Sequence, residues 1–283
     1  ADNPTKALTV PTPYVDLNEL LEPGFYGGQL IVIGARPSVG KSVVALDIAR
    51  HAAANGVRTF LASLEMGEAE LASRFLAATT RVPLTKTKQI PNVPDVLTDD
   101  DWQRIAKGHS HASELNDLLQ ILDTSTVLKM GAFTTAVVRR QLAAMEKRGM
   151  PAGLLVVDYL QLVTPLRRVD NRQVEVAEAS RTFKLIAAEF RIPIVLIAQL
   201  NRASEQRMDK RPMLSDLRES GAIEQDADVV MLLHREDMHD KESPRAGEMD
   251  IILAKNRNGR TGTVALAFQG HYSQAADLAR WSG

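Results

Sequence analysis

Short apolar runs alternate with amphipathic stretches along most of the chain. Their near-continuous apolar character is typical of strands in a parallel sheet whose two faces are both covered. The runs are "LIVIG" (30–34), "TFLAS" (59–63), "LLVVD" (154–158), "IPIVLIA" (192–198) and "VVMLL" (229–233). They predict five buried strands.

Between these runs, apolar positions recur at the spacing of an α-helix. Thr98 is a predicted N-cap, and Gly149 is a predicted stop after a helix that begins with a threonine cap. The predicted helices cover residues 41–54, 97–107, 134–149 and 172–190.

The C-terminal part of the chain has a different pattern. In "MDIILAKNRNGRTGTVALAF" (249–268), two apolar strands flank Asn258-Gly259, and Asn-Gly is a strong hairpin signal. We therefore predict one α/β domain, a mostly parallel central sheet flanked by helices with an antiparallel hairpin towards one edge. Its predicted bounds are 25–272, after a Pro- and Thr-rich linker or arm (1–24) and before a tail (273–283).

The first predicted strand leads into "GARPSVGKS", which is similar to a phosphate-binding loop. The usual pattern places its first glycine at position 35, but position 35 is alanine and the glycine is Gly34. Alanine fits if its φ is negative, so the departure weakens the match without breaking it. The alternative is a plain strand–turn–helix with an exposed lysine.

A strand, a tight turn and a helix start together form the geometry that binds phosphate, because backbone N–H groups and the positive helix end face the anion. Gly40 allows a close approach, Lys41 can reach the outer phosphates, and the Ser42 hydroxyl can ligate Mg²⁺. The predicted nucleotide-binding residues are Ala35, Arg36, Pro37, Ser38, Val39, Gly40, Lys41 and Ser42, together with Asp158.

Three more polar residues follow predicted strands. Asp158 could hold Mg²⁺ through water, Glu65 could act as general base, and Gln199 could sense a γ-phosphate. Each has an ordinary alternative: a turn aspartate, a glutamate facing a helix dipole, and a satisfied strand-end amide. Because ligands of open α/β sheets bind at the carboxyl ends of the strands, the joint pattern favours a site.

The composition narrows the class of protein. Of 283 residues, 45% are hydrophobic and 24% are charged, and no segment is long and apolar enough to span a membrane. The chain has no cysteine, which excludes disulfides and thiolate metal sites and suits a cytoplasmic protein. The net charge of -1 argues against binding nucleic acid through bulk charge.

Five motifs together resemble those of DnaB-type replicative DNA helicases, in their C-terminal, RecA-like motor domain. The similarity runs from about residue 15 to 272 and implies a longer protein with an N-terminal domain. The motifs are "GARPSVGKS", "SLEM", "VVDYLQL", "AQLNRASEQRMDKRPMLSDLRESGAIEQDAD" and "AKNRNGRTGTV".

The resemblance implies a RecA-like P-loop ATPase that forms a homohexameric ring with ATP and Mg²⁺ between subunits. It makes Glu65 the catalytic glutamate, with Lys41 and Gln199 also catalytic. Ser42 and Asp158 would bind the metal, partly through water. Lys255 and Arg257 match the basic pair that reaches into the next subunit's site, and their spacing puts them on one face of a strand.

The same resemblance makes Arg218, Glu219 and Gly221 the loop that follows single-stranded DNA, with primase and a helicase loader as further partners. Residues 201–220 contain no aromatic side chain, which favours contact with the DNA backbone over base stacking. The expected activity is DNA-stimulated ATP hydrolysis and unwinding. The alternatives are a RecA- or RadA-like recombination ATPase and a nucleotide-binding ring scaffold.

Overall fold

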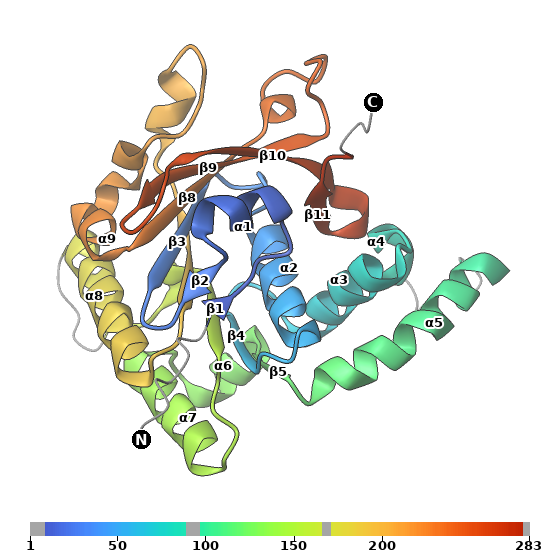
Figure 1. Cartoon of the computed structure of the whole chain (residues 1–283), viewed down its shortest axis with the longest axis horizontal. Coiled ribbons are helices and arrows are strands. Elements are labelled where there is room, and N and C mark those ends of the chain that lie inside the picture. Colours follow the sequence, from blue (N-terminus) through green and yellow to red (C-terminus); the bar gives the residue numbers. More distant parts are fainter. Residues whose placement is uncertain (1–8, 89–96, 166–170, 280–283) are drawn as a thin grey trace.

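The computed structural model describes residues 9–88, 97–165 and 171–279, without the side chains of 109–116 and 218–220. Within these residues, nine strands form one sheet in the order β11-β10-β9-β8-β3-β7-β6-β4-β5 (Figure 1). The strands are β3 (Leu30–Ala35), β4 (Thr59–Ser63), β5 (Leu119–Leu122), β6 (Leu154–Asp158), β7 (Ile194–Gln199), β8 (Val229–His234), β9 (Glu248–Asn256), β10 (Gly262–Gln269) and β11 (Gln274–Asp277).

The sheet has a parallel half and an antiparallel half. Strands β5, β4, β6, β7, β3 and β8 pair in parallel, and β9, β10 and β11 continue the sheet in antiparallel fashion. The predicted fold class is therefore confirmed, including the antiparallel hairpin. The hairpin turn is longer than an Asn-Gly turn, because Gly262 pairs with Leu253 and leaves the residues between outside the ladder.

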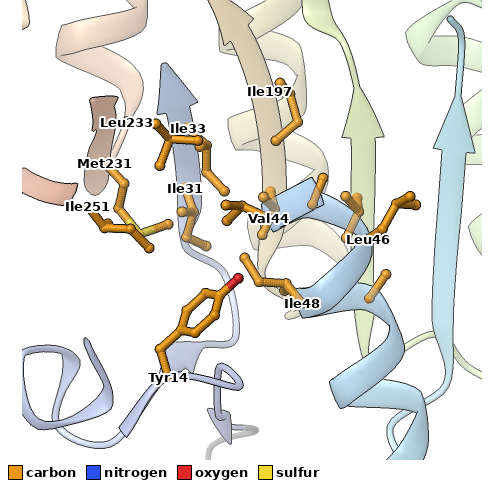
Figure 2. Close-up of a cluster of buried hydrophobic side chains, with 14 of the residues drawn as sticks. Tyr14, Ile31, Ile33, Val44, Leu46, Ile48, Ile197, Met231, Leu233 and Ile251 are labelled. Carbon is orange, nitrogen blue, oxygen red and sulfur yellow. The ribbon is translucent and has the colours of Figure 1, made fainter. Parts of the chain in front are cut away.

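Successive strand residues point to opposite faces, and both faces are covered. Ile31 and Ile33 of β3 pack on the face that α2 covers, while Leu30 and Val32 pack among side chains of α7 and α8. Figure 2 shows Val44 and Ile48 of α2 against Ile31 and Ile33. Double-sided burial is the reason that these strands read as continuous apolar runs.

The helices agree closely with the periodicity. Thr134 caps α7 by accepting a hydrogen bond from the Val137 N–H, and Thr98 accepts one from the Asp101 N–H at the start of α5. Helix α5 is longer than its predicted range. The helices are α1 (Val15–Leu21), α2 (Lys41–Ala54), α3 (Glu68–Thr80), α4 (Leu84–Thr87), α5 (Asp99–Asn116), α6 (Thr124–Met130), α7 (Thr135–Lys147), α8 (Arg172–Phe190) and α9 (Gly221–Asp226).

Parts of the predicted arm and tail pack into the domain. In the arm, β1 (Thr9–Val10) pairs with β2 (Phe25–Tyr26), and α1 lies beside β10 and α2 (Figure 1). The Tyr14 hydroxyl donates to the buried Asp47 of α2 over 3.3 Å, and Ala275 of β11 donates its N–H to the same carboxylate over 2.8 Å. The domain boundaries stay a prediction.

None of the helices in the described part of the chain is long and apolar enough to cross a membrane.

Candidate functional site: a phosphate loop at the carboxyl edge of the sheet

The predicted phosphate loop joins β3 to α2. Ala35 ends the strand, fully buried, and it is not among the described residues with positive φ, so alanine fits where a glycine is more usual. Gly34 is required by packing instead, because a Cβ there would lie 2.8 Å from Leu200 Cδ2 and 3.0 Å from Leu232 Cδ2. The misplaced glycine thus reflects the packing beneath the loop.

Gly40 closes the loop at the N-cap of α2. Its φ of +118° lies in the left-handed region, where glycine is favoured. Having no side chain, Gly40 makes no side-chain cap, and the first turn of α2 carries no acidic residue. No carboxylate of the helix itself therefore competes for its first N–H groups, and its positive end is suited to an anion.

The side chains of the loop residues 36–39 point in different directions, some to solvent and some into the protein. Arg36 is held by the Leu200 carbonyl and by Glu205, each over 2.8 Å, while Pro37 and Ser38 are exposed. Val39 is buried against the core. A cleft of about 350 Å³ lies beside this loop, lined by Arg36, Pro37, Val39, Ser204, Glu205, Lys210, Pro212, Leu233, His234, Arg235, Met238 and His239.

The Lys41 ammonium group lies at the centre of the polar groups. Its Nζ is 2.5 Å from Glu65 Oε2 and 3.3 Å from Asp158 Oδ1, and it sits 4.2 Å from the centre of the Tyr159 ring. The lysine is largely buried, whereas the Glu65 side chain is 49% exposed. The Glu65 carboxylate is thus in contact with the amine and accessible to solvent water.

Ser42 and Asp158 fit the predicted metal site. Burial raises the pKa of Asp158, while Lys41 and the Ser42 hydroxyl oppose that shift. Its Oδ2 atom is buried without a hydrogen-bond partner, so a ligand position is available next to the serine hydroxyl. Mg²⁺ keeps several waters and needs only one or two protein oxygens, so this pair fits it. Within the described residues, no cluster of three or more acidic or histidine side chains offers another metal site.

The catalytic candidates come from four adjacent strands. The order β3-β7-β6-β4 brings the loop, Gln199, Asp158 and Glu65 to one edge. Gln199 is paired with Ala35 across β7 and β3, and it ends β7 with an exposed side chain. The structure therefore brings these predicted residues together, while their individual roles stay predictions.

Lys255 and Arg257 lie towards the other end of the strands, away from the phosphate loop. Strand β9 runs antiparallel to β8, and Lys255 pairs with Val230 near the start of β8. Val230 pairs with Val32, three residues down β3 from Ala35, so Lys255 lies about 10 Å below the loop at a strand's rise per residue. Arg257 lies lower still, because its N–H donates to the Asp228 carbonyl and the Asp228 N–H donates to the carbonyl of Leu30, five residues and about 16 Å below Ala35. The basic pair is too far from its own chain's phosphate loop to act there.

The three DNA-contact candidates lie at the junction of the 3₁₀ helix η4 (Leu214–Ser220) and α9. Gly221 is exposed at the start of α9. The side chains of Arg218 and Glu219 lie outside what the structure describes. Their contact with DNA stays a prediction.

Two features beside the loop were missed by the sequence reasoning. No role was predicted for Tyr159, although an aromatic residue directly after a strand-end carboxylate could have indicated a ring beside the Lys41 ammonium group. The Arg235 guanidinium stacks 3.8 Å from the centre of the Phe268 ring, and that ring would touch a Cβ at Gly40. No local pattern links Arg235 to Phe268, because the strands between them bring the two together.

The fold and this edge of the sheet define a class, a RecA-like P-loop nucleotide-binding domain. Comparison with known proteins is more specific: the model of the family "DnaB-like helicase C terminal domain" matches residues 9–277. The chain belongs to this family.

Relatives and solved structures agree. The chain is 46% identical over 271 residues to "Replicative DNA helicase DnaB" of Leifsonia xyli subsp. xyli (strain CTCB07), covering 95% of this chain and 56% of that protein. "ATPase Domain of G40P" superposes with a TM-score of 0.86 at 32% identity, covering 98% of this chain and 94% of that one.

A second structure, "The Structure Of A DnaB-Like Replicative Helicase And Its Interactions With Primase", also has a TM-score of 0.86 and 32% identity. It covers 95% of this chain and 62% of that one. The chain spans about half the length of the curated relatives it matches.

Proposed function

We propose that this chain is the ATP-hydrolysing motor of a replicative DNA helicase, working as a homohexameric ring that moves along single-stranded DNA. One observation carries the proposal. The phosphate loop, Glu65, Asp158 and Gln199 lie at the carboxyl ends of the parallel strands, while Lys255 and Arg257 lie towards the amino ends. A head-to-tail ring joins two such different faces and so completes each site from two subunits.

Within each site, Lys41 and the N-terminus of α2 bind the phosphates of ATP. Ser42 and Asp158 hold Mg²⁺, which neutralises the charge on the phosphates when bound. Glu65 orients and deprotonates the attacking water, and Gln199 contacts the γ-phosphate from the neighbouring strand. The Arg235–Phe268 stack offers a flat, charged surface at the loop for the base.

Arg257 and Lys255 act on the neighbour's nucleotide. A cation delivered in this way stabilises the charge of the transition state and is worth about 10³–10⁵ in rate. DNA contact by the Arg218–Gly221 segment is sequence-independent and made to phosphates. Six copies of one loop around a channel reconcile DNA binding with a net charge of -1.

Primase and a loader are the expected protein partners, and the cytoplasm is the expected location. A recombination ATPase is not favoured, because the family match and the relatives are helicases. The remaining alternative is a nucleotide-binding scaffold. DNA should stimulate ATP hydrolysis by the motor but not by the scaffold.

The test is ATP hydrolysis with and without single-stranded DNA, at several protein concentrations, for the unmodified chain, Glu65→Gln and Arg257→Ala. Turnover that rises with concentration, responds to DNA and collapses in both variants supports the shared-site motor. Concentration-independent hydrolysis that tolerates Arg257→Ala would overturn the shared site. Nucleotide binding without DNA-dependent turnover would favour the scaffold.

A further inference from the structure

Asp228 links α9 to β8, and its buried carboxylate makes two different sets of contacts. Oδ2 accepts hydrogen bonds from the Leu30 N–H over 2.8 Å and from Lys184 Nζ over 2.5 Å. Oδ1 instead accepts one from Arg257 Nη1 over 3.3 Å. The first oxygen ties the start of β3 to α8, while the second holds the predicted trans-acting arginine.

Backbone bonds fix the position of this carboxylate. The Asp228 N–H donates to the Leu30 carbonyl over 2.8 Å, and the Arg257 N–H donates to the Asp228 carbonyl over 2.9 Å. The base of Arg257 is therefore anchored, while its side chain is 54% exposed. A half-exposed arginine anchored at its base can extend towards a neighbouring subunit.

Lys255 is attached to the same segment. Its Nζ donates to the Glu224 carbonyl in α9 over 2.6 Å, and burial together with the nearby Arg257 lowers its pKa. Helix α9 continues directly from η4 and is pinned to the core by Ile223. In Figure 1, α9 lies next to the ends of β8 and β9 and the top of α8.

We propose that Asp228 is a positioning residue for Arg257, and that α9 with Asp228 forms a mount joining the DNA-contacting segment to the cations offered to the next subunit. This inference rests on the proposed function.

The physical reason is pre-organisation. A free arginine side chain has many rotamers, and ordering it costs conformational entropy when the transition state forms. Asp228 meets part of that cost in advance by fixing the guanidinium direction. Because misplacing a catalytic group by about 1 Å can cost roughly 10²-fold in rate, a partner at the base of the arginine affects turnover directly.

Asp228→Asn tests the two oxygens separately. The asparagine oxygen can still accept from Leu30 and Lys184, but its NH₂ group then faces Arg257 and cannot accept from it. We expect DNA-stimulated kcat to fall about 10- to 100-fold with KM for ATP unchanged, because only transition-state contacts are lost.

Mixing subunits separates positioning from folding. Asp228→Asn subunits keep an intact phosphate loop, and Lys41→Ala subunits keep an intact mount. In an equal mixture, about a quarter of head-to-tail interfaces pair an intact loop with an intact mount. DNA-stimulated turnover of the mixture should therefore exceed the mean of the two variants measured separately, and a purely structural defect would not be rescued.

Lys184→Met is the matched control, since it removes a partner of the other oxygen. It should lower the melting temperature and leave DNA-stimulated turnover close to that of the unmodified chain. If Asp228→Asn does not fold, as judged by near-UV circular dichroism, Asp228→Glu replaces it. That change keeps the charge, displaces it by one methylene, and should also lose turnover and recover on mixing.

Arg257→Ala separates a failure of the shared ATP site from a failure of the positioning role of Asp228. If it leaves turnover unchanged, the shared site of the proposed function fails. If it abolishes turnover while Asp228→Asn and Asp228→Glu retain it, the shared site stands and the positioning role is overturned. Loss in the Asp228 variants that mixing does not rescue, although mixing rescues Arg257→Ala, would also overturn it.

Discussion

Gly40→Ala tests the phosphate loop where its geometry is most demanding. The residue has a φ of +118°, which costs a side-chain-bearing residue about 1–2 kcal/mol. A Cβ would also lie 2.7 Å from both Met249 Cε and Phe268 Cε2. Overpacking of this kind adds about 1–3 kcal/mol, so we expect a total loss of about 2–5 kcal/mol in the free energy of unfolding.

Gly56→Ala is the matched control. Gly56 follows the same helix with a φ of +80°, and nothing lies within 4 Å of the position of its Cβ. Only the backbone cost of about 1–2 kcal/mol applies there. The difference between the two variants therefore measures the contact with Met249 and Phe268.

Urea unfolding followed by circular dichroism gives both free energies, and titration with a fluorescent ATP analogue gives nucleotide affinity. Gly40→Ala should weaken the affinity, because shifting Phe268 disturbs the start of α2 and the stacked Arg235. Gly56→Ala should bind normally. Equal stability losses in the two variants would refute the contact argument, and unchanged affinity in Gly40→Ala would refute the phosphate-binding role of this position.

Three further outcomes are expected. Bonds from Lys86 and Thr98 lower the pKa of Asp101 to about 2, so its contribution of at most about 2 kcal/mol is present above pH 4 and lost as pH falls towards 2. Asp101→Asn should flatten that part of the stability profile, measured by urea unfolding at each pH, and a profile that keeps its slope would contradict it. Asp158→Asn should reduce the gain in ATP affinity from Mg²⁺ over EDTA by about 10- to 100-fold, measured by calorimetry; an unchanged gain would remove Asp158 from the metal site. Thr134→Ala should cost about 1 kcal/mol in urea unfolding, because the α7 cap is lost, and a neutral result would show that water replaces it.

The local sequence pattern was enough to predict the elements in which buried residues recur at regular spacing. The strands at 59–63 and 154–158 and the helices at 41–54 and 172–190 have the predicted bounds. Other elements depend on a neighbour. Strand β5 is only four residues long and two of them are exposed, and it is a strand because β4 presents an open edge for pairing.

The chemistry divides in the same way. Residues close together in the chain, such as Gly40, Lys41 and Ser42, showed the phosphate loop by their spacing alone. Glu65 and Asp158 followed from a rule about strand ends. The direct contact of Lys41 with both carboxylates required the order of the strands in the sheet.

The sequence by itself determined the five buried strands, the C-terminal hairpin, the principal helices, the phosphate loop and the family, because each depends on residues near one another in the chain. Only the tertiary structure decided that Asp228 holds Arg257, that Arg235 stacks on Phe268, and that the basic pair lies across the sheet from its own loop. These contacts arise from the register between β8, β9 and β10. A register is the residue pairing between strands that are far apart in the sequence, so it cannot be predicted from any one strand alone.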